Sequence, residues 1–547
     1  MNTVEEHHSI RKVEGHDGSV ELPDYERYTK TKKFCIIGLA LAWVRVACCI
    51  SVSVYIILTD GQNSLARAYK NSDGKHTLVR EVKITDAVAE ALAFLVNILV
   101  TLLTDTMGFI HSTSLRWAWY REERLEFNTN IRLFTSARKS AVNRWHANAI
   151  WTACLILCYA STSQVLVADG SGAFGYSNLY GLAVGVLAIG LLGQAVIATW
   201  SAFSLHQIAT WSSNPLKNAL ALRHHELAHV PGRSMMAVSG KNDASVAKGP
   251  RHHQKRLYRS IMAIRYIVAL VWALPVMAIA WAIALTLISW KSHPDSRVMA
   301  SSWASNPYEP GALYTSTPAD ADIPLVLGPN PWPASPRPMR FPVELLLGIL
   351  VVCAIQGPQT MRLHCIELVV YMTRDEESWR AANRSSKPAR KGAHLNTNAF
   401  ISAVTSWPNI VLFVEKSLLH WVLGQSLLPT FWFQQGNRAF VLYMVYIRVY
   451  IFASTTFCLA LFTTYLVFRR PGGCQPATWG HFQTLSNLID DWNVGEKGDL
   501  YWGDKGVRSK GYGMLVQVGL WKASGQFGRI LFMLRFQGNI YSIYKEY

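Results

Sequence analysis

The chain has 547 residues, half of them apolar, and a formal net charge of +18 at pH 7. Apolar runs of about 18 to 30 residues recur along its whole length, and each is long enough to cross a hydrocarbon core of ~30 Å as a helix. This distribution excludes a purely soluble multidomain protein, although the mean hydropathy is only +0.14. Polar loops between the runs lower the mean.

The runs predict an all-α, polytopic transmembrane helix bundle of about eight spans. The predicted spans are 34–59, 86–110, 148–168, 181–203, 262–289, 343–360, 408–428 and 439–468. The predicted bundle fills 34–468, after an N-terminal tail (1–33) and before a C-terminal tail (469–547); its larger loops are 111–147, 204–261, 290–342 and 361–407. The seventh span contains Pro408, Glu415, Lys416 and His420, so a re-entrant or surface helix is the alternative there.

The distribution of Lys and Arg between the loops predicts the orientation of the chain in the membrane. With both termini in the cytoplasm, the cytoplasmic segments hold 39 Lys and Arg residues and the outer segments hold 10. Enrichment of Lys and Arg in cytoplasmic loops is the rule for membrane proteins, and anionic lipids of the inner leaflet attract the same residues. The positive charge therefore needs no nucleic-acid partner, and we expect an integral protein of the plasma membrane. Without a short leader, the first span is expected to be a signal anchor.

The outer loop 290–342 holds 11 of the 22 prolines, which predicts an extended, non-helical connection. Proline also occurs inside two spans, as Pro275 and Pro358, where it can kink a helix and release backbone carbonyls. After the second span, Trp117 and Trp119 stand among Arg116 and Arg121, a pattern typical of a helix lying at the lipid headgroups.

One motif suggests an enzyme. His225, Glu226 and His229 form an HExxH pattern, in which two imidazoles hold zinc and the carboxylate activates water. Against this, Pro231 follows closely and the loop is rich in histidine. A GxGxxG at 170–175 lacks the strand and helix of a dinucleotide site. We therefore expect no cofactor, and a membrane-bound zinc metalloprotease is the alternative function.

Polar residues inside the spans are more informative, because each is costly in the membrane unless paired or hydrated. The second span carries a polar stripe at helical spacing, which marks the face turned toward protein. From their depths, two ion pairs are predicted: Arg45 with Glu415, and Glu90 with Arg448. The stripe consists of Asp86, Glu90, Asn97, Thr101, Asp105 and Gly108.

Six segments resemble uncharacterised multi-pass membrane proteins of filamentous fungi: HSTSLRWA (111–118), ERLEFNTNIRLF (123–134), TWSSNP (210–215), LHCIELVVYMTRDEESWR (363–380), HFQTLSNLIDDW (481–492) and YWGDKG (501–506). The resemblance extends from the second span to about residue 506. It implies a multi-pass fold, and it carries no activity, cofactor, substrate or site residue to this chain.

Together these patterns predict an integral membrane protein without assigned activity, and a transporter or membrane scaffold is favoured over an enzyme. An ion or small molecule is the expected substrate class, and the sequence does not specify it or the oligomeric state. The predicted intramembrane polar core consists of Arg45, Glu90, Asn97, Asp105, Glu415 and Arg448.

Overall fold

The structure is a computed structural model of the whole chain. It describes residues 30–59, 79–129, 132–168, 177–204, 208–224, 227, 256–292, 322–327, 341–382, 393–394, 404–434, 437–470, 479–489, 499–500, 533–536 and 539–542. Statements about presence or absence below concern these described residues.

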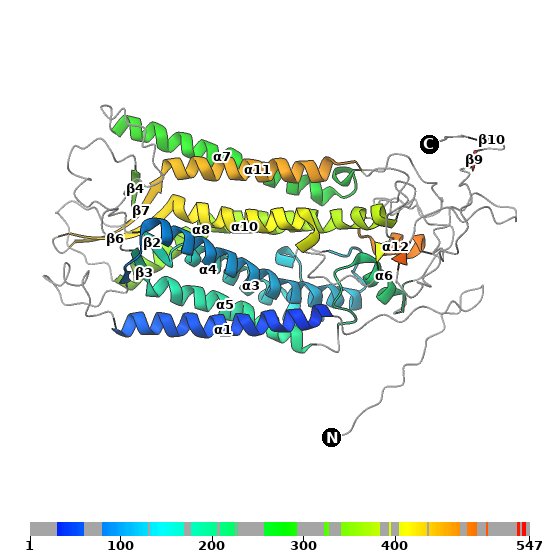
Figure 1. Cartoon of the computed structure of the whole chain (residues 1–547), viewed down its shortest axis with the longest axis horizontal. Helices are drawn as coiled ribbons and strands as arrows, with labels where there is room; N and C mark the ends of the chain where they lie inside the picture. The colour runs from blue at the N-terminus through cyan, green and yellow to red at the C-terminus, as the bar shows by residue number, and fades with distance from the viewer. Residues whose placement is uncertain are drawn as a thin grey trace, which may run out of the picture.

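In the part of the chain that the structure describes, eight long helices run side by side along the molecule (Figure 1). They alternate in direction along the chain, so that α1 begins and α11 ends at the same end of the bundle. In chain order they are α1 (Lys30–Thr59), α3 (Asp86–Arg121), α4 (Trp145–Thr162), α5 (Gly181–Phe203), α7 (Met262–Ser292), α8 (Phe341–Ala382), α10 (Trp407–Ser426) and α11 (Tyr446–Phe468).

Two small antiparallel sheets lie at one end of the bundle, called here the sheet end (Figure 1). The first has the order β1 (Val79–Val82), β3 (Ser177–Tyr180), β2 (Leu166–Ala168), and the second the order β4 (Asp322–Leu327), β7 (Asn437–Val445), β6 (Leu427–Gln434). The expectation of an all-α chain is therefore wrong in detail. β7 contains Phe440, Val441, Tyr443 and Val445, and such β-branched and aromatic residues suit a pleated strand.

The opposite end, called the loop end, gathers short elements from three distant parts of the chain (Figure 1). They are the 3-10 turns η2 (Arg132–Phe134), η3 (Ala141–Asn143) and η5 (Leu257–Arg259) and the helices α6 (Pro215–His224) and α12 (Phe482–Leu488). α6 packs against α12 and is buried from Pro215 to Leu222. Further short strands are β5 (Ala393–His394), β8 (Asp499–Leu500), β9 (Met533–Phe536) and β10 (Asn539–Ser542).

Among the described residues, five helices are long and apolar enough to cross a membrane: Lys30–Thr59, Ala87–Arg121, Gly181–Phe203, Met262–Leu287 and Ile447–Phe468. Many large apolar side chains on them are exposed, for example Ile37, Leu41 and Val44 on α1. An exposed apolar belt around a helix bundle is what lipid contact requires. The chain is therefore an integral membrane protein with a helical core.

Some predicted span limits differ from the helices. The predicted span 439–468 begins within β7, and its helix starts only at Tyr446. The span 148–168 reaches into β2, because α4 ends at Thr162. The span 343–360 is much shorter than α8, which has 42 residues. For the first two of these spans, the apolar sequence extends beyond the helix into a neighbouring strand. For the third, the apolar sequence stops before the end of the helix.

Buried apolar residues form two main clusters, each within one half of the bundle. The first joins α1, α3, α4 and α5 with the short helices of the loop end. The second joins α7, α8, α10 and α11, with Ala160 of α4 at its margin. The two halves meet where α10 packs on α3 and α8 packs on α4. This junction is where the polar side chains described below are located.

The interfacial helix expected after the second span is instead a continuation of α3 into the loop end. Trp117 is buried and its indole Nε1 donates to Thr210 O at 3.0 Å. Arg116 is also buried, with Nη1 donating to Ser212 O at 3.1 Å. These side chains therefore fasten the segment 208–214 to α3 rather than facing lipid headgroups.

The N-terminus of α12 is expected to be sensitive to pH. His481 Nδ1 accepts the Thr484 backbone N–H at 3.3 Å, so the cap requires a neutral ring. Burial lowers the pKa of His481, and Glu126 only partly opposes this. The cap thus contributes stability above the unfolded pKa of about 6.5 that is lost as the pH falls through the lower folded pKa.

Hydrogen exchange of the Thr484 and Leu485 amides, corrected for intrinsic rates, should show constant protection above a pH of about 6.5 and declining protection as the pH falls below that value. His481→Asn retains an N-cap acceptor without a titrating ring and should abolish the decline. Equal pH dependence in the wild type and this variant would show that His481 is not the titrating group.

Candidate functional site

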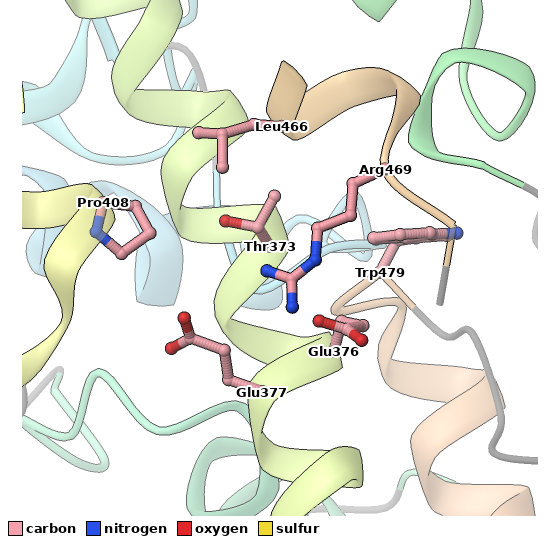
Figure 2. A pocket seen from close by; sticks show the side chains of 7 residues that line it. All are labelled: Thr373, Glu376, Glu377, Pro408, Leu466, Arg469 and Trp479. Atoms are coloured by element: carbon pink, nitrogen blue, oxygen red, sulfur yellow. The ribbon is translucent and has the colours of Figure 1, made fainter. Parts of the chain in front are cut away.

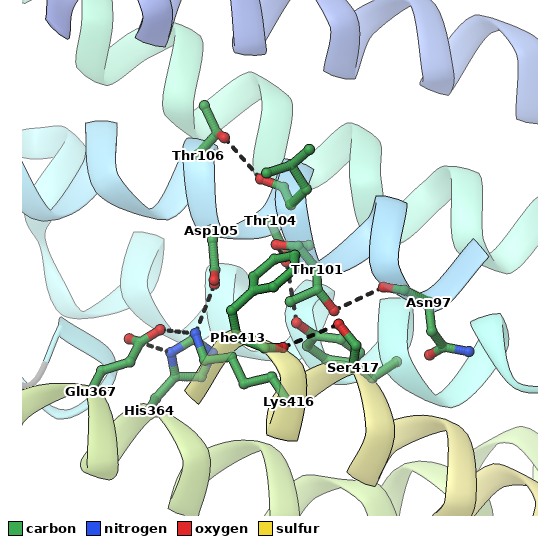
Figure 3. Close-up of polar contacts among 12 residues, drawn as sticks. Asn97, Thr101, Thr104, Asp105, Thr106, His364, Glu367, Phe413, Lys416 and Ser417 are labelled. Carbon is green, nitrogen blue, oxygen red and sulfur yellow. Dashed lines mark hydrogen bonds and ion pairs between the residues drawn. The ribbon is translucent and has the colours of Figure 1, made fainter. Parts of the chain in front are cut away.

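A buried lysine joins the two halves of the bundle. Lys416 on α10 donates from Nζ to Asp105 Oδ1 of α3 at 2.8 Å, and it also forms an ion pair with Glu367 of α8 (Figure 3). His364 Nδ1 lies 2.8 Å from the other Glu367 oxygen. We call Lys416, Asp105, Glu367 and His364 the Lys416 cluster. The cluster connects α3 of the first half with α8 and α10 of the second half.

The two carboxylates of this cluster are less buried than the lysine. The Lys416 side chain is 3% exposed, whereas those of Asp105 and Glu367 are 31% and 21% exposed. Both carboxylates line a cavity of about 70 Å³. This volume holds several waters, since one needs only about 10–15 Å³ by the same measure. The remaining lining residues are Gly108, Phe109, Ser112, Arg116, Asn128, Thr129, Ser213, Leu368, Tyr371 and Arg374.

The cavity lies on the loop-end side of the cluster, since Asn128 and Ser213 belong to the loop end and Tyr371 is 40% exposed. On the sheet side, the rings of Tyr159 and His420 stack face to face with centroids 3.6 Å apart and an interplanar angle of 7°. Both side chains are 1% exposed. A polar cavity therefore borders the cluster on its loop-end side, and an aromatic pair lies on its sheet-end side.

The stacked pair is itself held by polar partners. Tyr159 OH lies 3.2 Å from Thr104 Oγ1, which donates to the backbone of α3. His420 Nδ1 lies 3.0 Å from Gln356 Oε1, so this nitrogen is the donor. These contacts fix the two rings without using a charged group.

Polar residues of α3, α4, α8, α10 and α11 continue from the Lys416 cluster toward the sheet end. Asp105 and Glu90 are fifteen positions apart on α3, or about 22 Å at 1.5 Å per residue. This distance is most of a hydrocarbon core of ~30 Å. We call this set the polar row; besides the cluster it contains Glu90, Asn97, Thr101, Thr104, Tyr159, Gln356, Thr360, His420, Gln425 and Arg448.

At the sheet end of the row, the pair predicted from depth is present. Arg448 Nη2 lies 3.5 Å from Glu90 Oε1. Arg448 Nη1 also donates to the backbone and side-chain oxygens of Gln425, both at 3.1 Å. Asn97 is fully buried within the row and its Nδ2 donates to Ala93 O of its own helix.

The other predicted pair is not formed. Among the described residues, Arg45 and Glu415 have no ion pair with each other, because α1 packs against α5 and α3 while α10 packs against α3, α8 and α11. Arg45 instead lies near Cys49, one turn along α1. Glu415 lies near Arg362 of α8. The position of a residue along its span gives its depth in the membrane, but it does not show which helices are neighbours.

Arg362 also explains how one proline is accommodated. Pro275 inside α7 has no N–H, so the carbonyl four residues earlier lacks its helical donor. That carbonyl is Val271 O, and Arg362 Nη1 lies 3.4 Å from it. A buried guanidinium thus replaces the missing backbone bond, as occurs where membrane helices are interrupted.

A second, smaller cavity lies near the loop end between α8, α10 and α11 (Figure 2). Arg469 points toward Glu376 and Glu377 there, with Trp479 beside it. Its volume of about 10 Å³ leaves room for at most one water. It is therefore a packing feature of the loop end, and we do not assign a ligand to it.

The described residues contain no group of three or more His, Cys, Asp or Glu side chains that could hold a metal ion. His225, Glu226 and His229, the residues of the alternative protease, lie outside the described residues, as does the GxGxxG at 170–175.

The sequence prediction included Asp105 but omitted Lys416, Glu367 and His364 as site residues. The predicted sixth span ends at residue 360, so that His364 and Glu367 fall in the predicted loop 361–407. A helical stripe could have revealed them, because Gln356, Thr360, His364 and Glu367 are spaced four, four and three apart.

Comparisons with known protein families, with curated proteins and with solved structures find no match. The fold and the site therefore define the class on their own: an integral membrane protein with a helical bundle and a charged cavity at the junction of its two halves.

Arg448 should contribute more to stability than its partner Glu90. Arg448→Met leaves the oxygens of Gln425 without their donor inside the bundle, and we expect a loss of about 2–4 kcal/mol. Glu90→Gln keeps a hydrogen-bonding group and should cost about 1 kcal/mol. SDS unfolding titrations of the single and double variants measure both values. Strictly additive effects would show that the pair is not coupled.

Proposed function

We propose that the chain is an eight-span transporter of small polar solutes, with both termini in the cytoplasm and the polar row as its pathway. A cavity about 70 Å³ in volume carries the proposal, because it reaches the carboxylates of Asp105 and Glu367 from one end. A purely structural ion cluster needs no polar cavity beside its carboxylates. Solutes cross transporters at central polar sites between two parts of a bundle.

Eight spans require three helices in addition to the five that are long and apolar enough by themselves. α4, α8 and α10 have 18, 42 and 20 residues, and at 1.5 Å per residue even the shortest is about 27 Å long. Their charged and polar residues lie mainly on the junction between the halves, away from lipid. The alternation of the eight helices and the excess of Lys and Arg in the segments assigned to the cytoplasm support this topology.

In this proposal the loop end faces the cytoplasm and the described conformation is open toward it. The Tyr159–His420 stack closes the pathway on the other side. Transport then requires the two halves to move so that the cavity closes and the row opens toward the sheet end. We place the protein in the plasma membrane, where its basic cytoplasmic segments would meet an anionic leaflet.

Uptake by reconstituted proteoliposomes tests the proposal. A mixed pool of small carboxylates, amino acids, phosphate and inorganic cations is added outside, and the contents are identified by mass spectrometry. The matched control is the charge-free variant Asp105→Asn/Glu367→Gln/Lys416→Met, which removes the charges of the pathway together. We expect at least one solute to accumulate only with the wild type. Identical contents in wild-type, variant and empty liposomes would refute transport.

A further inference from the structure

A buried arginine side chain lines the cavity beside the Lys416 cluster and has no carboxylate partner among the described residues. Arg116 is 6% exposed and lines the cavity. Among the described residues, no carboxylate forms an ion pair with it, and the hydrogen bond of its side chain is to a neutral carbonyl, Ser212 O. Its Nε has no hydrogen-bond partner there. An uncompensated buried charge is strongly unfavourable, so an anion at this point would stabilise the site.

Other groups of the cavity fit the same ligand. Thr129 lines it, and its buried Oγ1 has no hydrogen-bond partner among the described residues. Arg374 lines it as well, with its guanidinium carbon 5.9 Å from the centre of the Tyr371 ring. Glu377 lies near Arg374 but lines the smaller cavity. The carboxylates of the lining, Asp105 and Glu367, are both bound by Lys416.

We propose that this cavity binds a small oxyanion, a carboxylate or a phosphate, through Arg116, Thr129 and Arg374. A guanidinium with free N–H groups beside a hydroxyl is the donor set that such oxygens prefer. The assignment rests on the proposed function in that it names the substrate class of the same site. The same donor groups would also bind the phosphate of an anionic lipid. The experiment therefore distinguishes a free anion from a lipid headgroup.

Binding of inorganic phosphate and of acetate is measured by calorimetry on the protein in nanodiscs of neutral lipid. Thr129→Val removes a hydroxyl that has no protein partner among the described residues, so it should fold normally and weaken binding about tenfold. Arg116→Gln should weaken binding about 100-fold. The matched control is Arg124→Gln, which removes an arginine whose side chain is 50% exposed outside the cavity and should leave binding unchanged.

A second arm replaces neutral lipid by phosphatidic acid. Thermal stabilisation by that lipid alone, lost with Thr129→Val, would assign the site to a headgroup; binding in neutral lipid assigns it to a free anion. No anion binding in either arm, or an equal loss with Arg124→Gln, would overturn the proposal. Anion binding without uptake would contradict the transport proposal but not the anion site. Uptake of cations only would contradict the anion site but not transport.

Discussion

Lys416→Met should lower the free energy of unfolding by about 3–5 kcal/mol, the typical result of removing one partner from a buried ion cluster. The variant leaves the carboxylates of Asp105 and Glu367 facing each other without their shared cation. Methionine keeps the length and much of the volume of the side chain, so lost packing contributes little. An SDS unfolding titration in mixed micelles measures the change.

The charge-free variant Asp105→Asn/Glu367→Gln/Lys416→Met is the control for this effect. Replacing a whole buried ion cluster is often nearly neutral, whereas breaking it is not. The triple variant should therefore recover most of the stability lost in Lys416→Met. A single variant within about 1 kcal/mol of the wild type, or a triple variant less stable than the single one, would contradict the assigned ion pairs.

Gly190→Ala should destabilise the protein by about 1–3 kcal/mol, because it overpacks the contact between α4 and α5. A Cβ at Gly190 would lie 2.8 Å from Cys154 O and 3.1 Å from Cys158 N, both backbone atoms of α4. Neither can move without shifting the helix. Small residues that allow such close approach are a common basis of helix packing in membranes.

Gly357→Ala is the matched control, since its new Cβ would meet only Ile156 Cδ1 at 3.5 Å, an ordinary contact. This substitution should be neutral or slightly stabilising, because alanine is the better helix former. Thermal unfolding of both variants in the same detergent provides the comparison. Similar midpoints for the two variants would indicate that α4 and α5 are not packed as closely as described.

The helical character of the chain could be predicted from the sequence because an apolar run of about 20 residues with few charges has the length of a membrane-crossing helix. The small sheets could not be predicted. Only two residues separate β6 from β7 in the sequence, and apolar residues of these strands fall within the predicted spans 408–428 and 439–468. Periodicity does not separate a short buried strand from the end of a buried helix.

The site was only partly predictable, for a similar reason. Depth pairs Glu90 with Arg448 correctly, although the predicted span 439–468 begins seven residues before α11. The same rule pairs Arg45 with Glu415, but depth does not specify neighbours: α1 packs against α5 and α3, whereas α10 packs against α3, α8 and α11. Lys416 was interpreted as a weakness of its span, whereas the structure makes it the centre of a cluster.

The central claim is that the polar row is a pathway that opens to water from alternate sides. Cysteine accessibility tests this claim most directly. Single cysteines are placed at Ser112, which lines the cavity, at Asn97, which is fully buried beyond the aromatic pair, and at Leu99, which is 46% exposed on the outside of α3. A membrane-impermeant thiol reagent is added to oriented proteoliposomes from either side, and labelling of the unsubstituted parent is subtracted. We predict that Ser112→Cys reacts from the loop-end side, Asn97→Cys from the opposite side, and Leu99→Cys from neither. An Asn97→Cys that stays as unreactive as Leu99→Cys from both sides would contradict the pathway.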